Sequence, residues 1–543
     1  MLHGTSPLYE EVLGLLAQIK TAAVVGMEGR PVLVEVHIGA GLPSINFVGL
    51  PDTAVREAKD RVRAALLSSD LEWPNRRVTI NLAPADIPKL GSSYDLAIAL
   101  GILVAGGKLP ASAVENLWVF GELGLDGSVR SAPGFLAVAN AAMRSRALLV
   151  CAEKDLAQVR GMRGLELAPI RSVRQLIDGL GQPVTSGESG AERRSYRKAL
   201  KTVVLNGSGI HGNEGWSACD LDLADVRGQP HALRAIEIAA AGALNLLMYG
   251  PPGSGKTMIA RRIPGILPPL DDDSAMEVQL VHSLVGAARA KRSWRTPPFR
   301  APHHTCSASA LVGGGSGMAL PGEVSLAHKG VLFLDELSLF SQHSLDALRQ
   351  PIEDGQVIIS RSRATVKYPS ATMLIAAANP CPCGHFAASA HSRSAAVSSC
   401  KCADAAVERY KRRISGPLLD RFDLAIPLKR VPPELMISSP PALSSAETRT
   451  RVEQARAVQA ERIGAKATVS GVPSAELARR LPLSPQPAEF LARLASACGY
   501  SGRRIHRIQR AAWVIASLDG RDDVQVADIE EAGRLWIHPY GES

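Results

Sequence analysis

The chain contains 543 residues, of which 46% are hydrophobic and 21% are charged. This composition is typical of a globular protein and excludes extensive disorder. Aromatic residues make up only 4%, which argues against a protein that stacks many bases on aromatic side chains. The length predicts about three domains. We expect a cytoplasmic protein, because the first 20 residues lack the pattern of a signal peptide and no apolar run reaches 18 residues.

The net charge of +9 is unevenly distributed along the chain. Residues 1–190 have a net charge of −1, whereas residues 191–543 have a net charge of +10. A basic balance permits a polyanionic partner such as nucleic acid, but it does not demonstrate one.

The first region, residues 1–180, mixes strand and helix patterns and predicts a compact α+β domain. Its strands are expected at 22–29, 31–38, 77–82 and 117–122, and its helices at 52–68, 94–104, 135–147 and 173–180. Residues 181–220 are rich in Gly, Ser and basic residues, as in a linker.

Two further regions follow. Residues 221–430 alternate helices, apolar strands and Gly-rich loops, which predicts a doubly wound α/β core. Residues 431–445 have the Pro/Ser composition of a second linker. Residues 446–543 have apolar positions with a period near 3.6 and predict a helical domain with helices at 451–462, 474–480, 488–498, 503–518 and 526–535.

A phosphate-binding loop is expected directly after the apolar segment 246–249. Glycines allow backbone N–H groups to surround phosphates, and the N-terminus of the following helix favours negative charge. Lys256 would reach the outer phosphates, and the Thr257 hydroxyl can bind Mg²⁺. The G-x-x-x-x-G-K-T pattern comprises Gly250, Pro251, Pro252, Gly253, Ser254, Gly255, Lys256 and Thr257.

A second apolar strand, 330–334, ends in two carboxylates. A buried parallel strand with this ending is typical of a Walker B motif. Asp335 would hold Mg²⁺ and Glu336 would act as the general base. A third strand, 372–378, ends at Asn379, which either orients the attacking water or is simply a turn residue before a proline.

The region 221–430 resembles the AAA+ ATPases of the magnesium-chelatase-like group, and nearly the whole chain resembles their YifB/ComM family. The segments that carry the resemblance are DVRGQPHALRAIEIAAAGALNLLMYGPPGSGKTM, APHHTCSASALVGG, PGEVSLAHKGVLFLDEL, ALRQPIEDGQVIISR, NPCPCG and RISGPLLDRFD. The chain departs from the family's GGHNLLM run at Leu244, which replaces an expected His.

The resemblance implies an arginine finger at Arg421, which would act on ATP bound by a neighbouring subunit of a homo-hexameric ring. The alternative for Arg421 is a salt bridge to Asp420 or Asp423. Similarity to the sensor 2 helix points to Arg503, with Arg504 as the alternative; both could instead lie on a solvated basic helix face.

The family also implies two insertions. Residues 301–320 resemble a helix 2 insert, in which His303 and His304 are either polar loop residues or metal ligands. Residues 358–369 resemble a β-hairpin whose Arg361, Arg363 and Lys367 suit a pore loop that grips DNA phosphates, unless the hairpin is only a solvated one.

Four of the eight cysteines form two C-x-C pairs, Cys381 with Cys383 and Cys400 with Cys402. Four thiolates can bind Zn²⁺ tetrahedrally, and paired cysteines in a reducing compartment are more often metal ligands than disulfides. The alternative is four free thiols.

The first domain resembles the Lon-protease fold (ribosomal S5 domain 2-like) through the segments PKLGSSYD and GELGLDGSVR. Lon-type chemistry needs a serine activated by a lysine. Ser93 falls near the nucleophile position, but Leu136 occupies the lysine position and cannot accept a proton. We therefore expect a scaffold or docking domain without peptidase activity.

The sequence thus predicts an ATP- and Mg²⁺-dependent AAA+ motor. Resemblance to the ComM branch implies branch migration of DNA recombination intermediates during natural transformation, with recombination proteins as further partners and no membrane contact. The alternatives are a magnesium-chelatase-type ATPase that remodels a partner protein and, against Leu136, a Lon-like peptidase.

Overall fold

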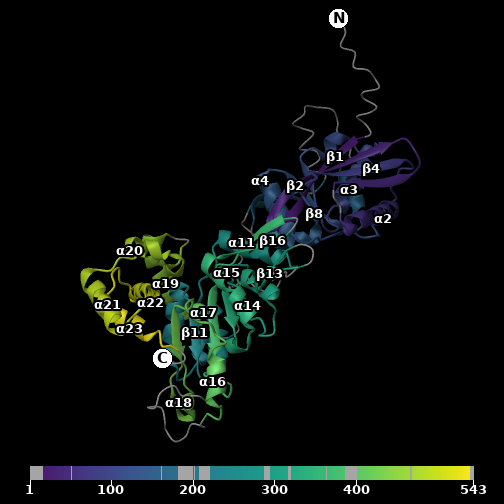
Figure 1. Cartoon of the computed structure of the whole chain (residues 1–543). Coiled ribbons are helices and arrows are strands. Elements are labelled where there is room, and N and C mark those ends of the chain that lie inside the picture. The colour runs from purple at the N-terminus through teal and green to yellow at the C-terminus, as the bar shows by residue number, and fades with distance from the viewer. Residues whose placement is uncertain are drawn as a thin grey trace.

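The computed structural model describes residues 16–49, 52–159, 162–180, 200, 202–206, 221–285, 294–315, 319–361, 364–385, 400–464 and 467–538. Three parts follow one another in space (Figure 1): a mixed domain in purple, an α/β core in teal and green, and a helical part in yellow. No helix within these ranges is long and apolar enough to cross a membrane.

The N-terminal part contains an eight-stranded sheet in the order β10-β9-β8-β5-β1-β2-β4-β3. Alternating apolar residues form the long β1–β2 hairpin, whereas β5 and β8 are buried throughout. The strands are β1 (Leu16–Val25), β2 (Glu28–Gly39), β3 (Ser44–Val48), β4 (Arg77–Ala83), β5 (Leu117–Val119), β8 (Leu148–Ala152), β9 (Arg163–Ile170) and β10 (Val203–Asn206).

Helices cover this sheet at the expected places. Asp52 caps α2 by accepting a hydrogen bond from the Val55 amide, and α3 is buried along its whole length. The helices of this domain are α2 (Thr53–Ser68), α3 (Asp95–Ala105), α4 (Phe135–Arg144), α5 (Leu156–Val159) and α6 (Val173–Leu180). Two short strands, β6 (Glu122–Leu123) and β7 (Val129–Arg130), pair outside the large sheet.

Part of the expected linker belongs to the N-terminal sheet. β10 pairs antiparallel with β9, and Leu200 is buried in the core of this domain. β10 has only four residues and is flanked by polar sequence, so its sequence alone does not predict a strand. It is defined by pairing with β9, which lies more than 30 residues earlier. Residues 181–199 and 207–220 lie outside the described ranges.

The α/β core is built on a five-stranded sheet in the order β12-β15-β18-β11-β19, and every neighbouring pair is parallel. Short apolar strands buried on both faces are what such a sheet requires. Its strands are β11 (Leu246–Tyr249), β12 (Phe299–Arg300), β15 (Val331–Leu334), β18 (Met373–Ala378) and β19 (Leu424–Pro427).

Helices and two small pairs of strands complete the core. The helices are α8 (Pro230–Gly242), α9 (Lys256–Ala260), α10 (Ile263–Ile266), α11 (Asp272–Ser283), α12 (Ala308–Val312), α13 (Glu323–Leu326), α14 (Gln342–Ala347), α15 (Arg349–Asp354), α16 (Asp404–Lys411) and α17 (Gly416–Leu419). The β elements are the pair β13 (Gly313–Gly314) and β14 (Leu320–Pro321) and the hairpin of β16 (Gln356–Arg361) and β17 (Ala364–Pro369).

The C-terminal helices share one apolar cluster with the core. Leu244 is fully buried in this cluster beside Val514 of α22, so the residue that departs from the family pattern has a packing role. The helices are α18 (Pro433–Ser438), within the expected second linker, α19 (Ser445–Ile463), α20 (Leu477–Arg480), α21 (Pro485–Cys498), α22 (Gly502–Leu518) and α23 (Val526–Arg534). α19 begins earlier than expected because Ser444 and Glu447 form a capping box.

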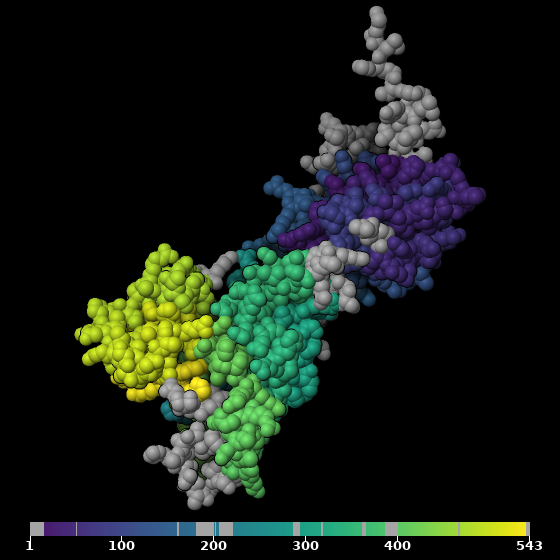
Figure 2. Space-filling view, viewed as in Figure 1, coloured from purple at the N-terminus to yellow at the C-terminus, as the bar shows by residue number. Residues whose placement is uncertain are grey.

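Among the described residues, the N-terminal domain contacts the core through the β1–β2 turn and through α4. The β1–β2 turn, with Val24 and Met27, packs on the apolar cluster that includes the β16–β17 hairpin. Gly26 lies so close to Val366 of β17 that a Cβ atom there would be 2.5 Å from a Val366 methyl group. The second contact joins α4 to Leu280 of α11. Figure 2 shows the purple and teal surfaces meeting at this junction.

Asn245 connects three strands of the core. Its Nδ2 donates to the Arg421 carbonyl at 2.8 Å, and its Oδ1 accepts from the Leu374 amide at 2.8 Å. Its own amide donates to the Asp423 carboxylate at 2.9 Å. One side chain therefore fixes the starts of β11 and β18 and the segment that leads into β19.

We predict that Asn245→Ala destabilises the core by about 2 kcal/mol or more, because it leaves a buried amide and a carbonyl unpaired. Calorimetric melting measures this as a lower transition temperature. The control is Asn81→Ala, which removes one partly exposed hydrogen bond to Glu35 and should cost less than about 1 kcal/mol. Equal shifts in the two variants would contradict the role of Asn245.

Candidate nucleotide site

The loop between β11 and α9 has the shape of a phosphate cradle. Gly250 has no room for a side chain, since a Cβ atom would lie 2.1 Å from the Leu428 carbonyl oxygen. Gly255 precedes α9 with a φ of +89°, a conformation that glycine adopts without strain. A cavity of about 360 Å³ lies here, lined by the loop together with Asp335, Glu336 and Asn379.

Lys256 is folded into the loop. Its Nζ donates to the carbonyl oxygens of Gly250 at 2.7 Å and Pro251 at 2.9 Å. Burial lowers the pKa of Lys256 to about 8 and outweighs the opposing attraction of Asp335 and Glu336. An anionic phosphate would favour the charged form of this amine, so the site fits a polyphosphate.

Thr257 and Asp335 provide oxygen ligands suited to Mg²⁺. The Thr257 hydroxyl donates to Asp335 Oδ2 at 2.8 Å. The two side chains are 78 positions apart in sequence and meet because β15 and β11 lie on either side of β18 in one parallel sheet. Hard oxygen ligands at this point fit a magnesium ion beside bound phosphates.

Glu336 has a strained backbone. Its φ is +51° and its ψ +49°, a left-handed conformation that is uncommon for a non-glycine residue. The side chain is about half exposed, and its Oε2 lies 3.8 Å from Nδ1 of His304. Asn379, which directly follows β18, lines the same cavity. The three strand ends thus gather the phosphate loop, two carboxylates and an amide around one space.

Arg421 and Arg503 lie in a different cavity, of about 730 Å³, at the opposite edge of the sheet. Residues that precede the strands line it, including Asn245 before β11 and Gly330 before β15. Arg421 is paired with Glu353 of α15, in place of the expected alternatives Asp420 and Asp423. Arg503 pairs with Asp420 at 3.1 Å.

Arg507 is a further cation of this cavity that sequence reasoning missed. It follows Arg503 by one turn of α22, donates to the Asp420 carbonyl at 2.6 Å and lies over the Trp536 ring. The sequence could have indicated Arg507, because a basic residue four positions after Arg503 lies on the same face of the helix. Arg504 instead lies over the Tyr500 ring, 3.9 Å from its centroid. The geometry therefore favours Arg503 over Arg504 as the arginine beside Arg421.

The two cavities are separated by the length of the strands. β11 has four residues and spans about 13 Å between its two ends. Lys256 follows its carboxyl end, and Arg421 precedes the neighbouring strand β19 at the amino end. The cavity that these arginines line is therefore not the one that the phosphate loop of their own chain lines.

Family models match most of the chain. "Magnesium chelatase, subunit ChlI" matches residues 222–436, its C-terminal model matches residues 442–535, and "Subunit ChlI of Mg-chelatase" matches residues 34–154. The uncharacterized protein YifB of Escherichia coli (strain K12) is 39% identical over 96% of this chain and 98% of its own length. Competence protein ComM of Haemophilus influenzae is 39% identical over 95% of this chain and 96% of its own.

The chain belongs to the YifB/ComM family of magnesium-chelatase-like AAA+ ATPases. Shorter similarities agree with its parts. Lon protease 2 of Bacillus subtilis is 29% identical over 25% of this chain, which supports the Lon-like fold of the first domain. The magnesium-chelatase 38 kDa subunit of Acidiphilium rubrum is 32% identical over 11% of this chain.

Two residues of the Lon-like domain bear on peptidase chemistry. Ser93, which the resemblance to the Lon fold puts near the nucleophile position, is half-buried just before α3. Leu136 lies in α4 and is 2% exposed, within an apolar cluster that includes Phe135 and Val138. Position 136 therefore supplies packing instead of a base.

The hairpin of β16 and β17 has two different faces. Val357, Ile359, Val366 and Tyr368 are buried, whereas Ile358 and Lys367 are exposed. Arg361 ends β16, and Arg363 lies outside the described residues. Of the three basic residues expected to contact DNA, the structure therefore places Lys367 on the outer face, whereas the inner face is packed on the core and the β1–β2 turn.

The expected insert at 301–320 contains α12, β13 and the start of β14. The rings of His303 and His304 are tilted by 34° with their centroids 4.1 Å apart, and His303 Nδ1 lies 2.9 Å from the Thr305 hydroxyl. Within the described ranges, the group of side chains close enough to share a metal ion consists of cysteines. The histidines therefore fit the polar-loop interpretation better than the metal-ligand one.

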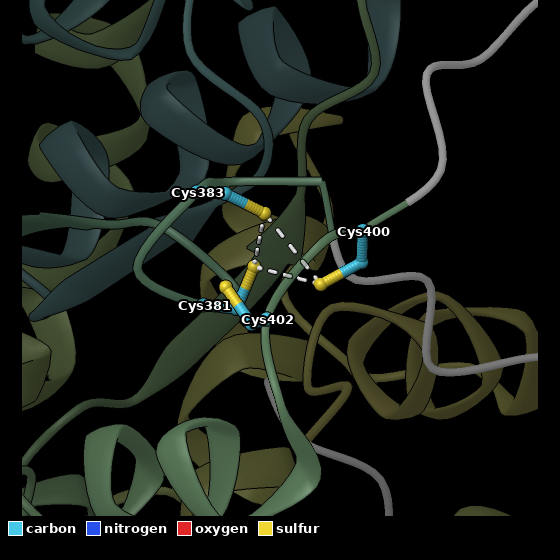
Figure 3. A group of neighbouring side chains, drawn as sticks. All are labelled: Cys381, Cys383, Cys400 and Cys402. Carbon is cyan, nitrogen blue, oxygen red and sulfur yellow. Dashed lines mark hydrogen bonds between the residues drawn. The ribbon is translucent and has the colours of Figure 1, made fainter.

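The four cysteines of the two C-x-C pairs converge after β18 (Figure 3). All four sulfur atoms lie within 4.8 Å of one another, and Cys381 is fully buried. Burial disfavours the Cys383 thiolate, but hydrogen bonds from the backbone amides of His385 and Lys401 outweigh it and lower the pKa of Cys383 to about 6. The group can hold a metal that prefers sulfur ligands.

The pKa of Lys256 predicts a pH dependence of nucleotide binding. Below about pH 8 the lysine of the free protein is charged; above it, binding a phosphate must be accompanied by proton uptake. Affinity for a non-hydrolysable ATP analogue should fall about tenfold between pH 7 and pH 9. Calorimetric titration at several pH values measures it.

Lys256→Arg is the control, because the guanidinium stays charged over this range. The affinity of this variant for the ATP analogue should not fall between pH 7 and pH 9, whatever its absolute value. The same fall in both proteins would show that Lys256 is not the titrating group.

Proposed function

We propose that this ATPase works as a subunit of a homo-hexameric ring in the cytoplasm, that it acts on DNA, and that it promotes branch migration of recombination intermediates in natural transformation. The observation that carries the ring is the placement of Lys256 and Arg421 at opposite edges of one sheet. The near full-length similarity to a competence protein supports the DNA part.

Within one subunit, the loop 250–257 and Lys256 would bind the phosphates of ATP. Thr257 and Asp335 would hold Mg²⁺, which neutralises developing phosphate charge when it is bound. Glu336 would accept a proton from the attacking water, and Asn379 would orient that water. The cysteine cluster would hold a structural Zn²⁺.

Across the interface, Arg421 would stabilise the transition-state charge on ATP held by the neighbour, with Arg503 in support. In the isolated chain Arg421 pairs with Glu353 and Arg503 pairs with Asp420. When the ring assembles, the two arginines would leave these carboxylates and bind the phosphates of the neighbour's ATP. The cavity of about 730 Å³ at this edge is where the neighbour's ATP would meet these arginines.

Mixing two inactive variants tests this arrangement. Lys256→Ala and Arg421→Ala should each abolish ATP turnover when they are alone. In a 1:1 mixture, about a quarter of the interfaces of a cyclic ring pair an intact phosphate loop with an intact arginine. Turnover should therefore reappear on mixing, as measured by phosphate release. A mixture that stays inactive, although native mass spectrometry detects mixed rings, would refute a finger acting in trans.

The DNA part of the proposal is tested by stimulation of the ATPase. The turnover rate is measured without DNA, with single-stranded DNA and with a four-way junction at low salt. We expect the junction to raise the rate and to bind. If neither DNA binds or stimulates, the motor on DNA is wrong, and a chelatase-type ATPase that remodels a partner protein becomes the better account.

Lys367 on the outer face of the hairpin provides a sharper test. Lys367→Ala should weaken junction binding equally for different sequences and reduce the slope of log K against log salt by about 1. Fluorescence anisotropy at several salt concentrations measures both. Lys108→Ala, which removes an exposed lysine of the N-terminal domain paired with Glu72, is the matched control and should change neither. An unchanged slope for Lys367→Ala would remove this hairpin from the DNA interface.

A further inference from the structure

The four sulfur atoms of the cysteine cluster are spaced for a tetrahedral metal. Cys381 and Cys383 lie 3.3 Å apart, Cys383 and Cys400 3.5 Å, and Cys381 and Cys400 3.7 Å. Zinc–sulfur bonds of about 2.3 Å in a tetrahedron place sulfurs about 3.8 Å apart. A disulfide would need about 2.05 Å. The spacing is therefore close to that of a zinc tetrathiolate and far from that of a disulfide.

The surroundings suit thiolates. The backbone amides of His385 and Lys401 donate to the Cys383 sulfur, as amides do around metal-bound thiolates. Sulfur ligands exclude Mg²⁺, which prefers oxygen, and favour zinc.

The position of the cluster connects it to the nucleotide site. Cys381 follows Asn379 by two residues, so a ligand of the metal lies almost at the end of β18. Gly384 packs so tightly on the phosphate loop that a Cβ atom there would lie 2.3 Å from Pro252. Cys402 is two residues before α16, whose Arg409 lines a cavity together with Glu336 and Asn379.

We infer that Cys381, Cys383, Cys400 and Cys402 bind one Zn²⁺, which fastens the strand end bearing Asn379 to the start of α16 and supports the phosphate loop. The four cysteines are thus positioning residues for the hydrolysis of ATP. The metal joins two chain segments that are 16 residues apart. The positioning role rests on the proposed ATPase function, whereas the metal site does not.

The test begins with metal analysis of the purified full-length protein by mass spectrometry. We expect about one zinc per chain in the wild type and near zero in Cys400→Ser/Cys402→Ser. Cys402→His, which keeps a zinc ligand, should retain the metal. The matched controls Cys306→Ser and Cys498→Ser should also retain it, since these two cysteines lie outside the cluster. Wild-type protein without metal, or with iron in place of zinc, would overturn the site.

Kinetics then separate positioning from simple support of the fold. The double Ser variant should lose kcat by about 10- to 100-fold, because small displacements of a water-orienting group are costly, and KM should change much less. Cys402→His should recover most of the kcat. If the zinc-free variant keeps the wild-type kcat, Zn²⁺ does not position Asn379.

Two measurements guard against ambiguous outcomes. If the double Ser variant does not fold, zinc is stripped from the wild type with a mercurial and a chelator, and is restored with thiol and zinc; kcat should fall and return. A dye that detects released zinc follows the metal throughout. If the wild type has no ATPase activity, the proposed function fails, but the zinc content still decides the metal site.

Discussion

The parallel pairing of five short strands is the constraint on which the rest of the molecule depends. Because β11, β15 and β18 run in the same direction, the phosphate loop, Asp335 with Glu336, and Asn379 meet at one edge, although they are spread over 130 residues of sequence. The same parallel order puts the segments before the strands, and with them Arg421, at the other edge. In the proposed ring, the two edges of neighbouring subunits would together form one complete nucleotide site.

The packing around this sheet connects its two edges to more distant parts. Asn245 ties the amino ends of the strands to the segment of Arg421, and the apolar cluster shared with α19 and α22 holds Arg503 and Arg507 beside it. At the opposite edge, Pro382 and residues of α16 line a cavity together with Asn379. The β16–β17 hairpin packs against the N-terminal domain through the β1–β2 turn. A movement of the hairpin would therefore change its contact with this turn.

Much of this could be predicted from the sequence because the signals are local. The period of the apolar residues predicted the bounds of α2 and α22 to within one residue. The sequence motifs identified the phosphate loop and the two carboxylates after β15. What could not be predicted depends on tertiary contacts. β10 joins the sheet through a distant partner, and Arg507 enters the cavity because α22 brings it to the carbonyl of Asp420. The pairing of Arg421 with Glu353 connects the segment after α17 to α15. The sequence predicted the four cysteines as zinc ligands or free thiols, and the structure brings their sulfur atoms within 4.8 Å of one another.

The most direct test of the central claim is a branch-migration assay on a synthetic four-way junction, with full-length protein and ATP. We expect the wild-type protein to convert the junction into its separated products only when ATP is hydrolysed. Glu336→Gln should bind the same junction and leave it unresolved. A wild-type protein that hydrolyses ATP but leaves the junction intact, or a Glu336→Gln variant that resolves it at the wild-type rate, would contradict the account.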